Sequence, residues 1–372
     1  MTTLPPPPPL TPIHRSPTMT DLAIPTTSPP PPPSNHRGIA NIGNTCYLNS
    51  AIQALRYTPI FRDYFTTDKW TAHSNDKRAG HELTKETAAL VSELCATTGP
   101  TRTLIPGRFV KSFVAAAREV NDEIFYGAQA DAAEAVHILL DTLHTHLARE
   151  VSMTVRGEAK THAAAEYVKS LESWSAFFHK EYSPLLDMFY GQTRSRVVCD
   201  RCGAKSDRYE PWNVLELPIP GADKAGGAAP TLRECMAARF DSEKLEDYAC
   251  ERCGDKGAAT KEHAVSRYPQ YLILSLKRFT NAGAKVRARI PYDEANVDLA
   301  DWRAWTSLQP RAAAAYRVYA TIEHLGSCRG GHYIMRARDN GAWIIYDDAM
   351  VHPSPIGGAA GPDTYMLFLE RL

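Results

Sequence analysis

The sequence lacks net charge and long apolar runs, and each absence excludes a class of protein. Its 42 Lys and Arg residues balance 42 Asp and Glu residues, so charge alone supplies no affinity for nucleic acid or anionic membranes, and we expect neither as a partner. We find no run of about 18 apolar residues and no basic start followed by an apolar signal region. We therefore expect a soluble protein of the cytoplasm, the nucleus or both.

Cysteine is scarce, with eight in 372 residues. That density is too low for a disulfide scaffold and favours reduced thiols. Four of the eight form two Cys-x-x-Cys pairs, Cys199 with Cys202 and Cys250 with Cys253. Four thiolates suit a closed, tetrahedral site with no open position for chemistry, so we predict a structural zinc ion (Zn2+). A nucleic-acid zinc ribbon is disfavoured because neither pair lies in a strongly basic stretch with stacking aromatics.

Residues 1–36 have a composition that cannot build a core. Proline runs at 5–9 and 29–33 lie among Ser and Thr, which predicts a disordered tail in extended polyproline conformations. A proline-reading domain is a candidate partner, although a solvated leader is the simpler interpretation because no paired basic anchor accompanies the prolines. A second flexible segment is predicted at 221–230.

The most informative stretch is residues 38–55. After a Gly- and Asn-rich turn, apolar residues recur from Leu48 at helical spacing, so we expect Cys46 in the first turn of a helix with Asn44 or Thr45 as N-cap. Unpaired backbone N–H groups and the positive end of the helix dipole would lower the pKa of the thiol there. Most lone cysteines are buried small hydrophobes, but such a residue does not need this polar lead-in.

The pattern Gly-x-x-Asn-x-Gly-Asn-Thr-Cys-Tyr-x-Asn-Ser-x-x-Gln around Cys46 resembles the cysteine box of the ubiquitin-specific proteases, papain-like deubiquitinating enzymes of ubiquitin C-terminal hydrolase type 2. The resemblance covers residues 37–372 and implies an α+β fold. Its parts would be an α-helical thumb (37–188), zinc-bearing β fingers with the start of the palm (189–280), and a β-sheet palm (281–372). The fingers of this family grip ubiquitin, so ubiquitin and ubiquitinated proteins are the expected partners.

The apolar periodicity agrees with a helical first half and a β-rich second half. Helical stripes are predicted within residues 83–94, 109–114 and 136–147. Strands are predicted at 271–279, 316–325, 332–338, 343–346 and 365–369. Residues 271–279 carry apolar side chains on both faces, as expected of a central strand covered on both sides.

A cysteine nucleophile needs a base, and thirteen histidines are available. His332 follows Gly330 and Gly331, which lack a Cβ and allow another backbone to approach closely. That property suits a substrate tail that ends in Gly-Gly. Residues 326–333 together with 343–348 resemble the histidine box of the same family.

The resemblance implies a role for each residue around this pair. Cys46 would attack the carbonyl of the C-terminal glycine of ubiquitin, His332 would protonate the leaving amine, and Asn41 would donate to the developing oxyanion. No cofactor joins the chemistry. Substrate contacts are expected at Gln129, Asp131, Glu134, Gly330, Gly331 and Tyr333. For Asp131 and Glu134, which match a second family box, a helix capping box is an equally good interpretation.

Two adjacent carboxylates, Asp347 and Asp348, could orient His332. The Asn-Gly pair at 340–341 predicts a β-hairpin with a two-residue loop. In that register His332 and Asp347 lie on the same face of the sheet and Asp348 points the other way. We therefore expect Asp347 to orient His332 and Asp348 to act on the oxyanion side.

Three further functions are compatible with these motifs. A catalytically inactive ubiquitin-binding scaffold is disfavoured because Cys46, His332, Asp347 and Asn41 are all present. A zinc-ribbon interaction module is the second, and a protease for a ubiquitin-like modifier is the third.

Overall fold

The computed structural model describes residues 14–15, 36–97, 103–155, 159–221, 229–280, 282–305, 310–355 and 361–372. Most of the predicted tail and residues 222–228 of the predicted flexible segment lie outside these described residues. Within the tail, β1 (His14–Arg15) pairs antiparallel with β2 (Met153–Thr154). No helix among the described residues is long and apolar enough to cross a membrane.

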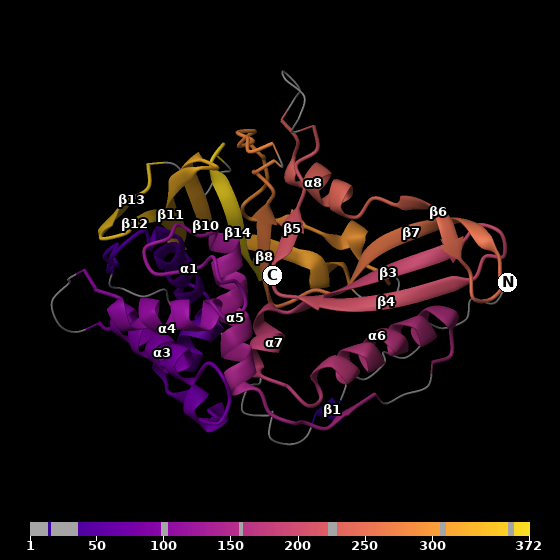
Figure 1. The fold of residues 1–372 in the computed structure, drawn as a ribbon, viewed down its shortest axis with the longest axis horizontal. Coiled ribbons are helices and arrows are strands. Elements are labelled where there is room, and N and C mark those ends of the chain that lie inside the picture. The colour runs from indigo at the N-terminus through magenta and orange to yellow at the C-terminus, as the bar shows by residue number, and fades with distance from the viewer. Residues whose placement is uncertain are drawn as a thin grey trace.

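The first half of the chain is helical, as predicted, and forms the group of helices in indigo to magenta in Figure 1. Its elements are α1 (Cys46–Arg56), α2 (Pro59–Thr66), the 3-10 helix η2 (Lys69–His73), α3 (His81–Cys95), α4 (Gly107–Ala117), α5 (Ala132–Leu147), α6 (His162–Phe178) and α7 (Pro184–Phe189). The three predicted helical stripes lie in α3, α4 and α5, which confirms them.

Helix α1 is buried along its whole length, including its polar residues. It packs against α5 on one side and against the strand β11 (Gly330–Asp339) on the other. Its polar side chains bond to neighbouring backbone carbonyls: Gln53 donates to Arg37 O at 2.9 Å and Arg56 to Leu94 O at 2.9 Å. Buried polar groups need such partners, so these bonds fix the position of α1 and of Cys46 at its start.

The second half contains a mixed sheet of the order β13-β12-β11-β10-β14-β8-β5, with β9 paired to β10. The bounds are β5 (Leu215–Leu217), β8 (Tyr271–Leu276), β9 (Val297–Asp298), β10 (Ala315–Ser327), β12 (Ala342–Asp347), β13 (Met350–Pro353) and β14 (Thr364–Arg371). Short 3-10 helices η3 (Ala300–Trp302) and η4 (Arg311–Ala314) and the helix α8 (Leu232–Arg239) lie between the strands.

Strand β8 is fully buried and covered on both faces, as predicted, with Ile273 in one apolar cluster and Leu274 in the other, but it lies next to the edge strand β5 and not at the centre of the sheet. It ends at Leu276, three residues earlier than predicted. Two residues beyond the strand, Arg278 is fully buried and its guanidinium donates to the carbonyls of Val286 and Ala288, both at 2.9 Å.

A second, four-stranded sheet of the order β4-β3-β7-β6 extends away from α1–α5, with α6 alongside β4 (Figure 1). Its strands are β3 (Gly191–Cys199), β4 (Lys205–Trp212), β6 (Glu243–Ala249) and β7 (Lys256–Arg267). The arrangement of helices, central sheet and projecting sheet matches the thumb, palm and fingers expected from the sequence, and confirms the α+β fold class.

His36, the last residue of the predicted tail, belongs with the folded part by its contacts. Its Nδ1 bonds the hydroxyl of Tyr346 at 2.8 Å, and its Nε2 lies 3.3 Å from the buried carboxylate of Asp339. The chain is therefore tied to the β11–β12 hairpin from His36 onward.

Candidate active site

Cys46 is the first residue of α1 and its side chain is almost fully buried. Thr45 occupies the N-cap position, but no side-chain cap bond forms, because its hydroxyl accepts from Ile42 N at 3.2 Å instead. The loop before it curls through positive φ angles at Gly43 and Asn44. Asn41 closes this loop by accepting from the backbone N–H of Thr45 at 3.0 Å.

The structure corrects the expected ionisation of Cys46. Burial raises the pKa of its thiol, and the negative charge of Asp348 acts in the same direction. The backbone N–H groups of Tyr333 and Tyr47 lower the pKa but do not outweigh burial. The expectation from the helix terminus was wrong because the sequence does not show how deeply this first turn is covered, and desolvation disfavours the thiolate.

The predicted hairpin register is confirmed. Strands β11 and β12 pair in the register that aligns Met335 with Tyr346 and closes at Asp339 and Ala342, with a two-residue loop at 340–341. His332 and Asp347 consequently lie on one face, and Nε2 of His332 is 2.6 Å from Oδ1 of Asp347. Oδ2 of Asp348 lies 4.0 Å from the same nitrogen, so the expectation that Asp348 points the other way was wrong. Asp348 follows the last residue of β12 and has a positive φ of 50°, which takes it out of the alternation of the strand.

Asp348 accepts hydrogen bonds from two amides. Asn41 donates to Oδ2 at 2.9 Å and Asn49 donates to Oδ1 at 2.8 Å. The amide of Asn41 is therefore oriented by Asp348. Asn49 was not assigned a role from the sequence; its place in the pattern Cys-Tyr-x-Asn-Ser-x-x-Gln was the signal that could have found it.

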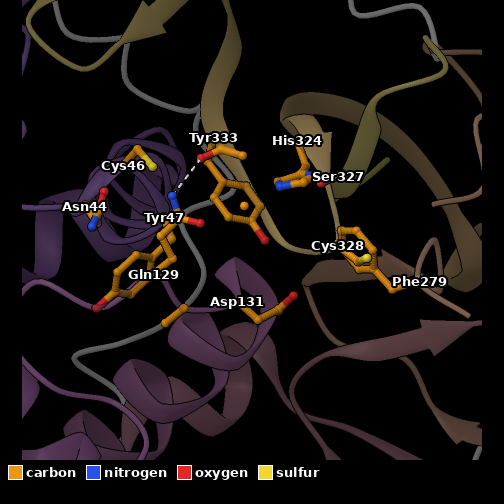
Figure 2. Close-up of a pocket in the computed structure, with 13 residues that line it drawn as sticks. Asn44, Cys46, Tyr47, Gln129, Asp131, Phe279, His324, Ser327, Cys328 and Tyr333 are labelled. Carbon is orange, nitrogen blue, oxygen red and sulfur yellow. Dashed lines mark hydrogen bonds between the residues drawn. The ribbon is translucent and has the colours of Figure 1, made fainter. Parts of the chain in front are cut away.

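A pocket of about 280 Å³ begins at Cys46 and Asn44 and runs between α1 and the central sheet. Figure 2 shows Cys46 and Asn44 at one side, Tyr333 in the middle, and Phe279 and Cys328 at the other side. Gln129, Asp131, Gly330, Gly331 and Tyr333, predicted as substrate contacts, all line it; Glu134 does not.

The close backbone approach expected at the two glycines before His332 occurs within the protein at Gly331. A Cβ at Gly331 would collide with the ring of His324 and the carbonyl of Leu325, and one at Gly330 would lie 3.0 Å from Oε1 of Gln129. The neighbouring strand therefore requires glycine at position 331, whereas at position 330 it is the positive φ of 155° that favours glycine. Gln129 also donates to Gly331 O at 3.4 Å.

Asp131 has a structural role in addition to its place in the pocket. Its Oδ1 caps α5 by accepting from the backbone N–H of Ala133 at 2.7 Å and of Glu134 at 3.0 Å, and its Oδ2 accepts from the hydroxyl of Tyr365. The carboxylate of Glu134 bonds Asn121 at 2.8 Å instead of completing the capping box.

The four paired cysteines meet at the end of the projecting sheet. All four sulfur atoms lie within 4.8 Å of one another. The two pairs have the same backbone turn: Cys199 N donates to Ala204 O, and Cys250 N donates to Asp255 O, each at 2.9 Å. Two matching turns that converge four thiols on one point fit a tetrahedral metal site, so this cluster can hold a metal ion.

Comparison with known proteins decides the family. The model of the family described as ubiquitin carboxyl-terminal hydrolase matches residues 37–369. This chain belongs to the ubiquitin carboxyl-terminal hydrolase family. Ubiquitin carboxyl-terminal hydrolase 2 of Gallus gallus is 30% identical over 343 residues, which cover 90% of this chain and 92% of that protein.

Other members of the family are longer. Ubiquitin carboxyl-terminal hydrolase 21 of Mus musculus is 28% identical over 367 residues, covering 91% of this chain but 62% of the relative. The fold is shared with a solved structure of the SAGA DUB module, Ubp8 with Sgf11, Sus1 and Sgf73, bound to monoubiquitin. That structure has a TM-score of 0.68 and 20% identity, and the match covers 94% of this chain and 72% of that chain.

Proposed function

We propose that this chain is a thiol-dependent deubiquitinase, which hydrolyses the peptide or isopeptide bond after the C-terminal Gly-Gly of ubiquitin. The observation that carries the proposal is the 2.6 Å bond between His332 and Asp347 on the strand against which α1 and Cys46 pack. It supplies an oriented base on the strand that packs against α1, and Cys46, the first residue of α1, lines a pocket.

The chemistry follows from which nitrogen of His332 is engaged. Because Asp347 accepts from Nε2–H, Nδ1 is the basic nitrogen. Burial raises the pKa of Cys46, so the thiol needs this base to take its proton as the sulfur attacks the glycine carbonyl. The imidazolium then gives the proton to the leaving amine, and water releases ubiquitin from the acyl-enzyme in a second attack assisted by the same base.

We assign the oxyanion to the side of Asn41. A primary amide has two N–H groups, and the one that binds Asp348 orients the other. One such donor is worth about 3–4 kcal/mol of transition-state stabilisation in a well-studied hydrolase. No step in this scheme needs a catalytic metal or cofactor.

We also propose that Cys199, Cys202, Cys250 and Cys253 bind one structural zinc ion. The four-thiol donor set and the matched turns support zinc over harder cations. All eight cysteines are free thiols, which supports a reducing compartment, the cytoplasm or the nucleus. The proline-rich segment remains a candidate ligand for a proline-reading domain.

Hydrolysis of a ubiquitin–aminocoumarin conjugate tests the proposed reaction. Wild-type protein should release the fluorophore. Cys46→Ser should abolish release and retain ubiquitin binding, because the hydroxyl is too weakly acidic for the same base. Binding without turnover by the wild type would identify an inactive scaffold, and turnover only of a conjugate of another modifier would reassign the substrate.

A further inference from the structure

The carboxylate of Asp347 has one partner in the part of the chain that the structure describes, and that partner is His332 itself. Among these described residues, no second side chain or backbone N–H fixes the direction in which the carboxylate points. Its position therefore depends on the backbone on either side, which belongs to Tyr346 before it and Asp348 after it. The contacts that hold these two neighbours decide how well the histidine is oriented.

Both neighbours are held by residues 36–39, which we call the entry segment because they lead the chain into its folded part. Nδ1 of His36 bonds the hydroxyl of Tyr346 at 2.8 Å. Ile39 N donates to Asp348 O, also at 2.8 Å. The entry segment therefore runs beside the strand end and the turn that carry the orienting carboxylate.

The entry segment is anchored to the helices as well. The carbonyl of Arg37 accepts from Gln53 of α1 at 2.9 Å, and Nη1 of Arg37 donates to Glu93 O near the end of α3 at 3.0 Å. Gly38 packs against the turn after β12, because a Cβ on it would be 2.3 Å from Ala349 O. The segment therefore links the helical half of the protein to the turn that follows β12.

His36 is the first residue of this segment, and its ring connects three elements. The hydroxyl of Tyr346 that it bonds lies 2.6 Å from the hydroxyl of Tyr57, the residue that follows α1. Its Nε2 lies 3.3 Å from Oδ2 of Asp339, the last residue of β11, whose side chain is 4% exposed. In the described part of the chain, the carboxylate of Asp339 has no other hydrogen bond or ion pair. A buried carboxylate needs such a partner, so loss of the imidazole would disturb both strands of the hairpin.

We propose that His36 is a positioning residue for the reaction. It holds Tyr346 and Asp339, and thereby keeps the carboxylate of Asp347 where it orients the catalytic histidine. The inference rests on the proposed function. Catalysis is sensitive to such displacements, since a misplacement of about 1 Å can cost about 10²-fold in rate. We expect the effect in kcat, because none of the residues joined by His36 lines the pocket of the site.

The test uses point variants of the full chain in hydrolysis of ubiquitin–aminocoumarin. His36→Leu removes both contacts of the ring and keeps an apolar side chain in its place. His36→Gln can restore them, because its amide oxygen can accept from Tyr346 and its amide nitrogen can donate to Asp339. Tyr346→Phe breaks the same link from the other side, by removing the hydroxyl and keeping the ring.

His73→Leu is the matched control. Nδ1 of His73 also bonds a tyrosine hydroxyl, that of Tyr64, at 2.8 Å, and His73 is likewise partly exposed, but it lies in η2. Its substitution removes the same kind of contact from the helical half and leaves both neighbours of Asp347 untouched. Thermal melts of all variants measure what each substitution costs in stability.

We expect His36→Leu and Tyr346→Phe to lose about tenfold in kcat at unchanged KM, and His36→Gln to retain most of the wild-type kcat. His73→Leu should keep the wild-type kcat even if its unfolding temperature falls. If His36→Leu does not fold, Tyr346→Phe decides in the same way.

Three results would overturn the inference. The first is a wild-type kcat in His36→Leu, and the second is a loss confined to KM. The third is an equal loss of kcat in His36→Leu and either His36→Gln or His73→Leu, because the loss would then not follow the contacts of His36. Inactivity of the wild type would instead refute the proposed function itself.

Discussion

The amide of Asn49 donates to Oδ1 of Asp348 at 2.8 Å across 299 positions of sequence. Because Asn41 donates to Oδ2 of the same carboxylate at 2.9 Å, one side chain holds both the loop before Cys46 and the helix after it. Asp348 itself has a positive φ of 50°, so the tight turn between β12 and β13 aims the carboxylate at α1. Asp347, one residue earlier, serves His332 instead.

Substitution of Asp347 and substitution of Asp348 should therefore have different effects on turnover and stability. Asp347→Ala removes the partner that orients His332, and we expect kcat/KM on ubiquitin–aminocoumarin to fall by about 10³-fold or more. Asp348→Ala should cost less turnover and should lower the unfolding temperature. Steady-state kinetics and thermal melts of both variants check this, and a larger kinetic loss for Asp348→Ala would place the orienting role on Asp348.

A double-mutant cycle should reveal the coupling of Asn49 with Asp348. Each single alanine variant removes the hydrogen bond between Asn49 and the charged carboxylate of Asp348, while Asp348 keeps Asn41 and Asn49 keeps Ala40 O as a partner, and such a bond contributes about 1.5–3 kcal/mol of unfolding free energy. The double variant should lose less than the sum of the two, with a coupling free energy of about 1–2 kcal/mol. Urea denaturation of the four proteins measures this quantity, and strict additivity would mean that the 2.8 Å contact contributes no stability.

Freshly purified protein should contain one zinc ion per chain by elemental analysis. Cys202→Ser should remove the zinc and lower the unfolding temperature, because structural zinc contributes on the order of 10 kcal/mol in small zinc-dependent folds. Cys328→Ser is the control, since Cys328 is exposed and distant in sequence from both pairs. Protein that holds no metal yet melts at the same temperature as Cys202→Ser would contradict the zinc assignment.

Alkylation of Cys46 should depend on pH in the way its burial dictates. Because burial raises the thiol pKa, the rate of labelling by iodoacetamide in the free protein should keep rising as pH passes the ordinary thiol pKa. Mass spectrometry of the Cys46 peptide, with the Cys328 peptide as the internal reference, follows each thiol separately. A rate that is already constant at neutral pH would show a preformed thiolate–imidazolium pair.

Acid should destabilise the helical half through buried histidines. Burial lowers the pKa of His144, whose Nδ1 bonds Ser183 at 2.8 Å, and the nearby Asp141 and Glu181 oppose this only in part. A neutral histidine with a lowered pKa stabilises the fold fully above the unfolded value of about 6.5, and this contribution is lost as pH falls below it.

His144→Gln keeps a neutral polar side chain at this position, so it should lose less stability between about pH 7.5 and about pH 5.5 than the wild type in urea denaturation. His352→Gln, on the exposed strand β13, should behave like the wild type. If His144→Gln loses as much stability at low pH as the wild type, the acid sensitivity belongs to other groups, among them His146, whose pKa burial also lowers.

Much of this architecture follows from local pattern. Helices α3, α4 and α5 form where the apolar stripes predict them, because a helix with one apolar face gains stability only by burying that face. The two-residue loop at 340–341 sets the register of β11 and β12, and with it the pairing of His332 with Asp347. The spacing of the four cysteines likewise anticipated their convergence.

Contacts between residues far apart in the sequence decide the ionisation of Cys46 and the partners of the site residues. Whether Cys46 is ionised depends on how deeply α1 is covered by β11 and α5, and the sequence contains no measure of that depth. The bonds of Asp348 to Asn41 and Asn49 join residues about 300 positions apart, and Gly331 is required by the ring of His324 on the neighbouring strand. Periodicity and motif spacing determine which elements form and which residue types are present, but desolvation and side-chain partners arise only when those elements pack together.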